Sequence, residues 1–288
     1  MNESSEAGMN RALIGKVYEG APATLSAEEI RAFAEATNDP HPMYFAESAP
    51  EGAVAPPLLP VKYCNRIYLT IFRDTELRVN FARLLFGEME MRFFGLLRPG
   101  EHVRATAQIS DIEDKDSGQI LTVVTKVFSG EEPRCEATAG FFVRSLTARP
   151  KGQRPAPPHA DMPPVAFEEA MVIREDQPNL FAKAADDPNP IHVDDDFARS
   201  VGLPGRILHG LCTMAFTSRA FVQRACGGDP RKLRRLKVRF SKPALPGQTV
   251  VTRAFEPEKT ASAWFYRFVA LTGPNDLVIT NGEAEVER

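Results

Sequence analysis

An internal duplication is the feature that most constrains what this chain can fold into. The segment FAEATNDPHPMY at residues 33–44 aligns without gaps with FAKAADDPNPIH at residues 181–192, and six of the twelve positions are identical. Two more pairs recur farther along at nearly the same spacing, Arg92-Phe93 with Arg239-Phe240 and Pro99-Gly100 with Pro246-Gly247. Such self-similarity indicates two copies of one structural unit.

A proline-rich stretch separates the two copies. Six prolines fall between Ala148 and Phe167, and a sequence of this kind favours extended backbone that sustains neither a helix nor an inner strand. We therefore predict a first repeat over residues 1–147, a linker over 148–167 and a second repeat over 168–288. With 288 residues, each repeat is long enough to bury its own core.

Each copy combines one long helix with several strands. Residues 210–225 contain no proline or internal glycine and place apolar side chains near helical spacing, and the apolar segment 57–72 occupies the matching place in the first copy. Residues 234–240 alternate charged and apolar side chains, as a half-buried strand does. Further strands are predicted near residues 87–93, 102–112, 119–128, 135–144, 249–256, 263–272 and 277–287. This is the composition of an α+β unit whose antiparallel sheet wraps a helix, and two such sheets can join edge to edge.

Polar groups suited to proton transfer gather in the second copy. In the run AADDPNPIH, Pro188 and Pro190 restrict the backbone. The side chains of Asp187, Asn189 and His192 can therefore project from a fixed loop. A carboxylate beside an imidazole can take up one proton and return another near neutral pH, and such a site benefits from preorganisation.

A second cluster, PGRILHGL at residues 204–211, leads into the predicted long helix. The N–H groups of a helix's first turn lack an intrahelical acceptor and carry the positive end of the helix dipole. Because Gly210 has no side chain, a carbonyl oxygen can approach its N–H, which makes this position a candidate oxyanion hole. His209, directly before the helix, is interpreted as a capping or packing residue.

The two clusters together resemble the MaoC-like, R-specific enoyl-CoA hydratase and 3-hydroxyacyl-thioester dehydratase family. The pattern D-x-N-P-[LI]-H is present at residues 187–192, and His209-Gly210 follows at the head of a helix. The first copy, with APP at 55–57 and FGEMEMRFFGLLRPGE at 86–101, is similar to the degenerate N-terminal repeat of two-repeat members. The resemblance therefore covers the whole chain. It implies a double hotdog fold with a thioester tunnel between the two units.

The resemblance also implies an activity in fatty acid metabolism: reversible syn hydration of 2-enoyl thioesters, with dehydration of R-3-hydroxyacyl thioesters as the reverse. Asp187 and His192 would hold and activate the water, and Asn189 would orient them. The N–H of Gly210 would polarise the thioester carbonyl. The acyl group would be carried by coenzyme A or an acyl carrier protein, and no cofactor is expected. Many members carry Ser-Gly before the catalytic aspartate, whereas this chain has Ala185-Asp186, whose carboxylate we expect to face solvent.

The first copy lacks most of these groups. At the matching positions it has Asp39 for Asp187, His41 for Asn189, Tyr44 for His192, and Pro57–Pro60 (PLLP) for Ile207–Gly210 (ILHG). Tyrosine is a poor proton shuttle at neutral pH, and Pro60 has no N–H to donate. We predict a single catalytic site, in the second copy, with Tyr44 and the apolar residues of the first copy contacting the substrate. Asp39 and His41 remain as an alternative acid–base pair.

Two charged runs admit more than one interpretation. The basic residues near the predicted strand 234–240 can bind the phosphates of coenzyme A or an acidic carrier protein, with Arg235 and Lys237 as the candidates, or can form an ordinary solvated strand face. The acidic run Asp194–Asp196 can suggest a metal site near Asp187 and His192. Since no cysteine or second histidine joins them at ligand spacing, we expect no metal and assign the run to N-capping of a helix over 197–200.

Composition excludes several other classes. No segment approaches the roughly 18 unbroken apolar residues of a membrane span, and the polar residues 1–10 do not form a secretory signal, so a cytoplasmic protein is expected. A net charge of −3 argues against nucleic acid as a partner. Four scattered cysteines indicate buried thiols. We expect a homodimer, or a monomer whose two repeats imitate one.

Two rival functions remain at this point. A hotdog thioesterase would act on similar substrates but needs a carboxylate on the long helix, and residues 211–225 contain none. A non-catalytic acyl-thioester-binding protein could keep the fold and the tunnel, but would usually carry a DNA-binding module, which this sequence does not suggest.

Overall fold

The computed structural model describes residues 8–45, 52–145 and 164–288. The first half contains helices α1 (Ala27–Ala36) and α2 (Val61–Arg73) and strands β1 (Val17–Glu19), β2 (Ala23–Thr24), β3 (Leu84–Phe93), β4 (His102–Lys115), β5 (Gly118–Ser129) and β6 (Glu132–Arg144). Short 3-10 turns lie at Arg11–Leu13, Pro42–Tyr44 and Phe81–Arg83. The long strands match the predicted ranges, and the predicted helix begins at Val61 instead of residue 57.

The second half repeats this order. It contains helices α3 (Gln177–Ala184), α4 (Pro190–Val193), α5 (Asp195–Ser200) and α6 (Gly210–Arg224), and strands β7 (Val165–Val172), β8 (Leu233–Phe240), β9 (Thr249–Phe255), β10 (Glu258–Lys259), β11 (Ala263–Leu271) and β12 (Leu277–Glu287). A 3-10 turn lies at Pro230–Lys232. The predicted linker lies outside the described residues up to position 163, and β7 includes its last three residues.

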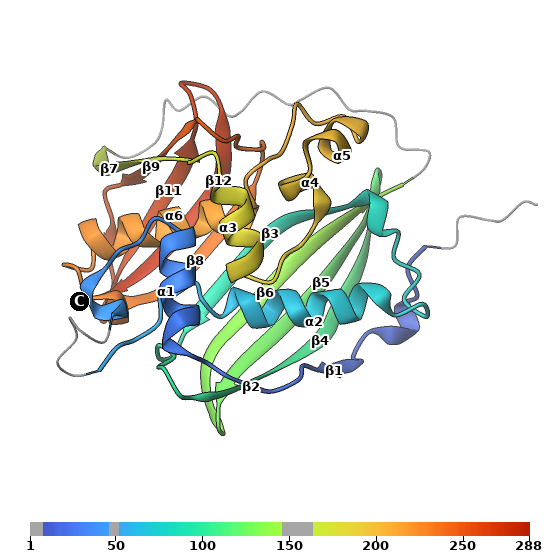
Figure 1. Cartoon of the computed structure of the whole chain (residues 1–288), viewed down its shortest axis with the longest axis horizontal. Helices are drawn as coiled ribbons and strands as arrows, with labels where there is room; N and C mark the ends of the chain where they lie inside the picture. Colours follow the sequence, from blue (N-terminus) through green and yellow to red (C-terminus); the bar gives the residue numbers. More distant parts are fainter. Residues whose placement is uncertain (1–7, 46–51, 146–163) are drawn as a thin grey trace, which may run out of the picture.

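A single antiparallel sheet holds the two halves together. Its order is β1-β4-β5-β6-β3-β8-β12-β11-β9-β7, with β2 beside β4 and β10 beside β11. The halves meet at β3 and β8, which pair from Glu88 with Arg239 to Arg92 with Arg235. Figure 1 shows α2 lying against the strands of the first half and α6 against those of the second. The predicted α+β architecture, with each sheet wrapping a long helix and the sheets joined at their edges, is confirmed.

Helix α6 and the cysteine side chains lie in the interior of the protein. Eleven residues of α6 are buried, from Leu211 to Val222, so this helix is covered on most of its sides. The four cysteines are buried free thiols, as predicted. No helix in the described ranges is both long enough and apolar enough to cross a membrane.

Charged side chains reinforce the junction between the halves. The guanidinium of Arg235, whose side chain is only 9% exposed, bonds Glu90 of β3 at 2.9 and 3.0 Å. It also contacts Glu283 at 2.7 Å and Glu285 at 3.4 Å, both on β12. One arginine thus links three strands from both repeats.

We expect Arg235→Met to lower the free energy of unfolding by about 2–4 kcal/mol, because three partly buried carboxylates lose their common partner. Urea denaturation followed by circular dichroism measures the change. Arg239→Met is the matched control, since Arg239 is 59% exposed and meets one carboxylate, that of Glu88, at 3.5 Å. Its replacement should change the free energy by less than about 0.5 kcal/mol. Equal losses in the two variants would contradict this role of Arg235.

Candidate active site

A cavity of about 960 Å³ extends between the two halves. At one part of its wall it is lined by Asp187, His192 and Gly210 of the second half. The first half contributes apolar and aromatic side chains, among them Tyr68, Leu69, Phe72, Phe86 and Phe141. The residues predicted to carry the chemistry therefore open onto a space large enough for an acyl chain.

The turn before Asp187 has a strained backbone. Asp186 adopts φ +52°, and Asn38, its counterpart in the first half, adopts φ +53°. Glycine reaches this left-handed region without cost, and Asp and Asn are the side-chain-bearing residues that tolerate it best. The turn brings the N–H of Asp187 to 3.0 Å from the carbonyl oxygen of Ala182, at the end of α3. Aspartate can therefore stand at this left-handed position.

The carboxylate of Asp186 pairs with the first half. Its Oδ2 lies 2.5 Å from Nε of Arg66 and 3.7 Å from Nζ of Lys62, both on α2. The expectation that Asp186 faces open solvent is wrong in this respect, since its side chain is 33% exposed and held by two cations. A carboxylate so neutralised has little repulsion to exert on Asp187.

Asp187 and His192 lie close together, but their side chains form no hydrogen bond with each other. A carboxylate oxygen of Asp187 and a ring nitrogen of His192 are within 4.8 Å of each other. His192 is 7% exposed, and its Nδ1 lies 2.9 Å from the carbonyl oxygen of Ile207. Because a carbonyl only accepts, Nδ1 carries a hydrogen and the neutral ring keeps a lone pair on Nε2. A separation of this size leaves room for one bridging water.

Burial brings the proton affinities of this pair toward each other. Desolvation raises the pKa of Asp187, against the opposing charge of His192. Desolvation lowers the pKa of His192, against the attraction of the Asp187 carboxylate and the Ile207 carbonyl. A raised pKa makes the Asp187 carboxylate a better proton acceptor, and a lowered pKa keeps His192 neutral, so either group can accept a proton from a bound water.

Asn189 acts on this pair through the backbone. Its N–H lies 3.4 Å from Oδ1 of Asp187, and its carbonyl oxygen accepts the N–H of His192 at 3.0 Å. The side-chain Oδ1 accepts the N–H of Ile191 at 3.3 Å and so caps α4. The structure thus gives Asn189 an orienting place, with its side chain engaged in capping.

Gly210 is the first residue of α6 and lines the cavity. A Cβ at this position would lie 3.0 Å from Cδ1 and Cε1 of the Phe240 ring, closer than side-chain carbons normally come. In the described part of the chain, no backbone acceptor is recorded for its N–H. A side chain at this position would therefore press on Phe240, and the N–H of Gly210 is free to polarise a carbonyl.

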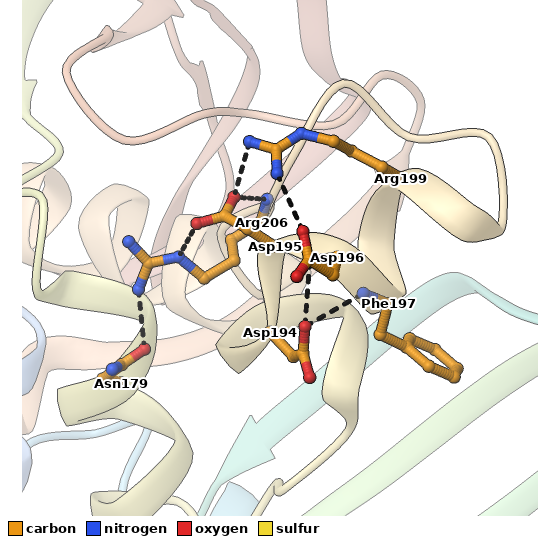
Figure 2. A network of polar contacts seen from close by, with 7 residues as sticks. All are labelled: Asn179, Asp194, Asp195, Asp196, Phe197, Arg199 and Arg206. Carbon is orange, nitrogen blue, oxygen red and sulfur yellow. Dashed lines mark hydrogen bonds and ion pairs between the residues drawn. The ribbon is translucent and has the colours of Figure 1, made fainter.

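The acidic run after His192 caps a helix. Oδ1 of Asp194 accepts the N–H groups of Asp196 and Phe197, each at 2.9 Å (Figure 2). Asp196 also meets Arg199 at 3.4 Å. The prediction of N-capping is confirmed, with α5 beginning at Asp195.

Asp195 has a further role in holding the wall of the site. Its carboxylate accepts the backbone N–H and Nε of Arg206 at 2.9 and 3.0 Å, and Arg206 also donates to Asn179 of α3 at 3.1 Å (Figure 2). The residue after Arg206 is Ile207, whose carbonyl fixes His192. This clamp therefore supports the orientation of the imidazole.

A second histidine does join the pair, which sequence spacing failed to indicate. His209 places a ring nitrogen within 4.8 Å of ligand atoms of Asp187 and His192. The two imidazole rings are stacked, with centroids 3.7 Å apart and planes 25° apart. A metal ion lies in the plane of each imidazole that binds it, so rings stacked face to face do not converge on one tetrahedral ion.

Three residues were predicted to contact the substrate or its carrier, and the structure places them in different surroundings. Lys237 lines the cavity, and its contact with a phosphate stays a prediction. Arg235 does not line it, and its guanidinium is bound by three carboxylates, which argues against the predicted contact of Arg235 with a phosphate. Tyr44 is 2% exposed, lies with its ring 5.2 Å from that of His41 and does not line the cavity. This burial argues against a contact between Tyr44 and the substrate, which stays a prediction.

The matching place in the first half holds a buried polar cluster. Asp39 is 4% exposed, and burial raises its pKa to about 6 against the nearby charge of Arg219 and the hydroxyl of Tyr44. Neither Asp39 nor His41 lines the cavity described above. Asp39 thus keeps the carboxylate of the duplicated motif, but this carboxylate does not reach the cavity.

We expect Asp39→Asn to leave turnover within about threefold and to flatten the pH dependence of stability. The folded state binds the Asp39 proton more tightly than the unfolded state does, so stability falls as pH rises from about 4 to about 6 and stays lower above. Asparagine removes this term, which should stabilise the protein by about 1–3 kcal/mol at pH 7. Thermal unfolding at pH 4.5 and pH 7 measures it. A loss of turnover in Asp39→Asn combined with His41→Ala, as large as that of Asp187→Asn, would instead assign catalysis to the first half.

Comparison with known proteins matches each half to a family model. A model described as MaoC like domain matches residues 159–270, and one described as FAS1-like, dehydratase domain region, matches residues 12–132. Each half of the chain thus matches a dehydratase-type family model, in both cases over less than half of the whole chain. A MaoC-like dehydratase from Phytophthora capsici has the same fold, with a TM-score of 0.80 at 24% identity over 98% of each chain. The predicted double hotdog fold is confirmed.

Curated relatives of this MaoC-like chain include hydratases and dehydratases. The 3-hydroxyacyl-thioester dehydratase Y of Mycobacterium tuberculosis is 32% identical over 188 residues, covering 62% of this chain and 64% of that protein. The peroxisomal multifunctional enzyme type 2 of Mus musculus is 32% identical over 222 residues, covering 73% of this chain and 28% of that protein. The chain thus spans less than two thirds of the length of these curated relatives.

Proposed function

We propose that this protein catalyses the reversible syn hydration of 2-enoyl thioesters and the dehydration of R-3-hydroxyacyl thioesters. One observation carries the proposal: Asp187 and His192 lie within 4.8 Å of each other on the wall of a large, mainly apolar cavity, which Gly210 also lines. Relatives named as hydratases and dehydratases support it.

In the hydration direction, a water held between Asp187 and His192 attacks C3 of the enoyl thioester. One of the two groups takes the proton that the water loses. The electron pair of the double bond moves toward the thioester oxygen, where the N–H of Gly210 and the first turn of α6 stabilise the negative charge. The group that accepted this proton then returns it to C2, so that the elements of water have added across the double bond. The reverse sequence eliminates water.

The first half supplies the space for the acyl tail. Its aromatic and aliphatic side chains line the cavity, and burial of an acyl chain against them contributes about 0.8 kcal/mol per methylene. Since both walls come from one polypeptide, a monomer can contain one complete site. The earlier division into two repeats and a linker, and a cytoplasmic location, remain predictions.

A hotdog thioesterase is the alternative that shares this substrate class. Such an enzyme hydrolyses the thioester with the help of a carboxylate on a long helix, and neither α2 nor α6 carries Asp or Glu. The carboxylate at this site comes from the turn before α4. The arrangement therefore favours addition of water to the double bond over hydrolysis.

The test is an assay of short, long and branched 2-enoyl thioesters on both coenzyme A and an acyl carrier protein. We expect loss of enoyl absorbance and formation of the R-3-hydroxyacyl thioester, with no free thiol. Release of thiol at a comparable rate would indicate a thioesterase. Binding of the thioesters without either product would indicate a non-catalytic binding protein.

A further inference from the structure

His209 is more deeply buried than either member of the proposed catalytic pair. It is 1% exposed, with one face of its ring stacked on His192 at 3.7 Å. The ring of Phe181 lies 5.0 Å away at a tilt of 50°. His192 is thus stacked on a second imidazole that is itself packed in the core.

Polar contacts fix which nitrogen of His209 carries its hydrogen. Nε2 lies 3.2 Å from the backbone carbonyl oxygen of Asp187, and because a carbonyl can only accept, Nε2 is the donor. Burial and the neighbouring His192 hold the pKa of His209 well below its usual value, so the ring stays neutral. One side chain therefore grips the main chain of Asp187 while it supports the ring of His192.

This arrangement has an energetic cost that simple packing would avoid. Nδ1 of His209 is buried and has no hydrogen-bond partner among the described residues, and an unsatisfied buried acceptor disfavours folding. His209 is the N-cap residue of α6, yet its side chain makes no capping hydrogen bond.

The first half shows what the fold alone requires at this position. Leu59 stands where His209 stands in the second half, directly before Pro60 and α2, and it is fully buried. In the first half, which lacks the proton-transfer pair, an apolar residue is thus enough to fill this position.

We propose that His209 is a positioning residue for the reaction, and that it locks the imidazole of His192 and the main chain of Asp187 in the productive arrangement. This inference rests on the proposed function. The contact at Ile207 holds one edge of the His192 ring, and the stack with His209 holds its face. Together they leave Nε2 of His192 as the unprotonated nitrogen of the neutral ring.

The decisive variant is His209→Leu, which installs the residue of the first half. We expect kcat to fall by about 10- to 100-fold, because small misplacements of a catalytic group have effects of this size, with KM changed less than about threefold. The melting temperature should change little, since removal of the unsatisfied nitrogen offsets the loss of the hydrogen bond to the Asp187 carbonyl. His209→Gln keeps an N–H for the Asp187 carbonyl and should recover part of kcat.

Nitrogen-15 NMR of the imidazole rings supplies a readout independent of activity. In the wild-type protein His192 should show a single tautomer protonated on Nδ1, and in His209→Leu a mixture of tautomers. Leu59→Ala is the matched control for packing damage before a long helix; it should lower the melting temperature and leave kcat unchanged.

Unchanged kcat and an unchanged His192 tautomer in His209→Leu would overturn the inference. So would a loss of kcat accompanied by a lower melting temperature and an unchanged tautomer, since that is the result of packing damage alone. A wild-type protein that shows the expected tautomer but hydrates no enoyl thioester would instead refute the proposed function.

Discussion

Asp187→Asn should lower turnover of 2-enoyl thioesters by about 10²- to 10⁴-fold, the usual cost of losing a general acid or base. Asparagine keeps the size of the side chain but can neither accept nor return a proton. His192→Gln should have a comparable effect for the same reason. Steady-state hydration rates measure the losses, with circular dichroism to establish that the fold is intact.

Asp186→Asn is the matched control for Asp187→Asn. Asparagine tolerates the left-handed backbone of this turn, while the ion pairs with Arg66 and Lys62 are lost. We expect turnover within about threefold of wild type, since Asp186 does not take part in the proton transfer. A near-normal rate in Asp187→Asn, or an equal loss in both variants, would contradict the assignment.

The pH profile of the wild-type protein should reflect the same pair. His192 must be neutral to accept a proton from water, and burial lowers its pKa. It therefore stays neutral to lower pH than an exposed histidine, and the acid limb of kcat/KM should lie below the ordinary histidine value of about 6.5. Asp187→Asn removes the carboxylate that raises this pKa, so the residual activity should persist to still lower pH.

Local sequence was sufficient to predict that Asp187, His192 and Gly210 lie together at one cavity, because each lies in a short motif whose backbone geometry is set by neighbouring prolines or by a helix start. The duplication predicted the two long helices and the joined sheets for a similar reason: a repeated pattern implies a repeated unit. These features depend on contacts within about ten residues or on comparison of one half with the other.

Features that depend on pairing between the halves could not be predicted in this way. The alternation around Arg235 shows that it faces away from the core, but not that the register of β3 and β8 brings it to Glu90. The approach of His209 to His192 depends likewise on how the turn after α5 folds back. Tyr44 fills the place of His192 in the alignment, yet it is packed in the core of the first half.

Substitution of Gly210 should also cause a large loss of turnover. The test must separate the loss of the backbone N–H from the steric effect of an added side chain. Any side chain here meets Phe240, so both variants are made in a Phe240→Leu background. Gly210→Ala retains the N–H, whereas Gly210→Pro removes it. Proline is tolerated at the first position of a helix, because the N–H there has no intrahelical partner.

In the Phe240→Leu background we expect Gly210→Ala to keep kcat within about tenfold of its parent. Gly210→Pro should lose about 10²- to 10³-fold, the effect of deleting one oxyanion-hole donor. The loss should appear in kcat more than in KM, because the charge on the thioester oxygen develops only in the transition state. The first half already carries this change in natural form, as Pro60 stands before α2. If the proline variant matched the alanine variant, the N–H of Gly210 would not be the group that stabilises the enolate, and another donor in the first turn of α6 would have to supply it.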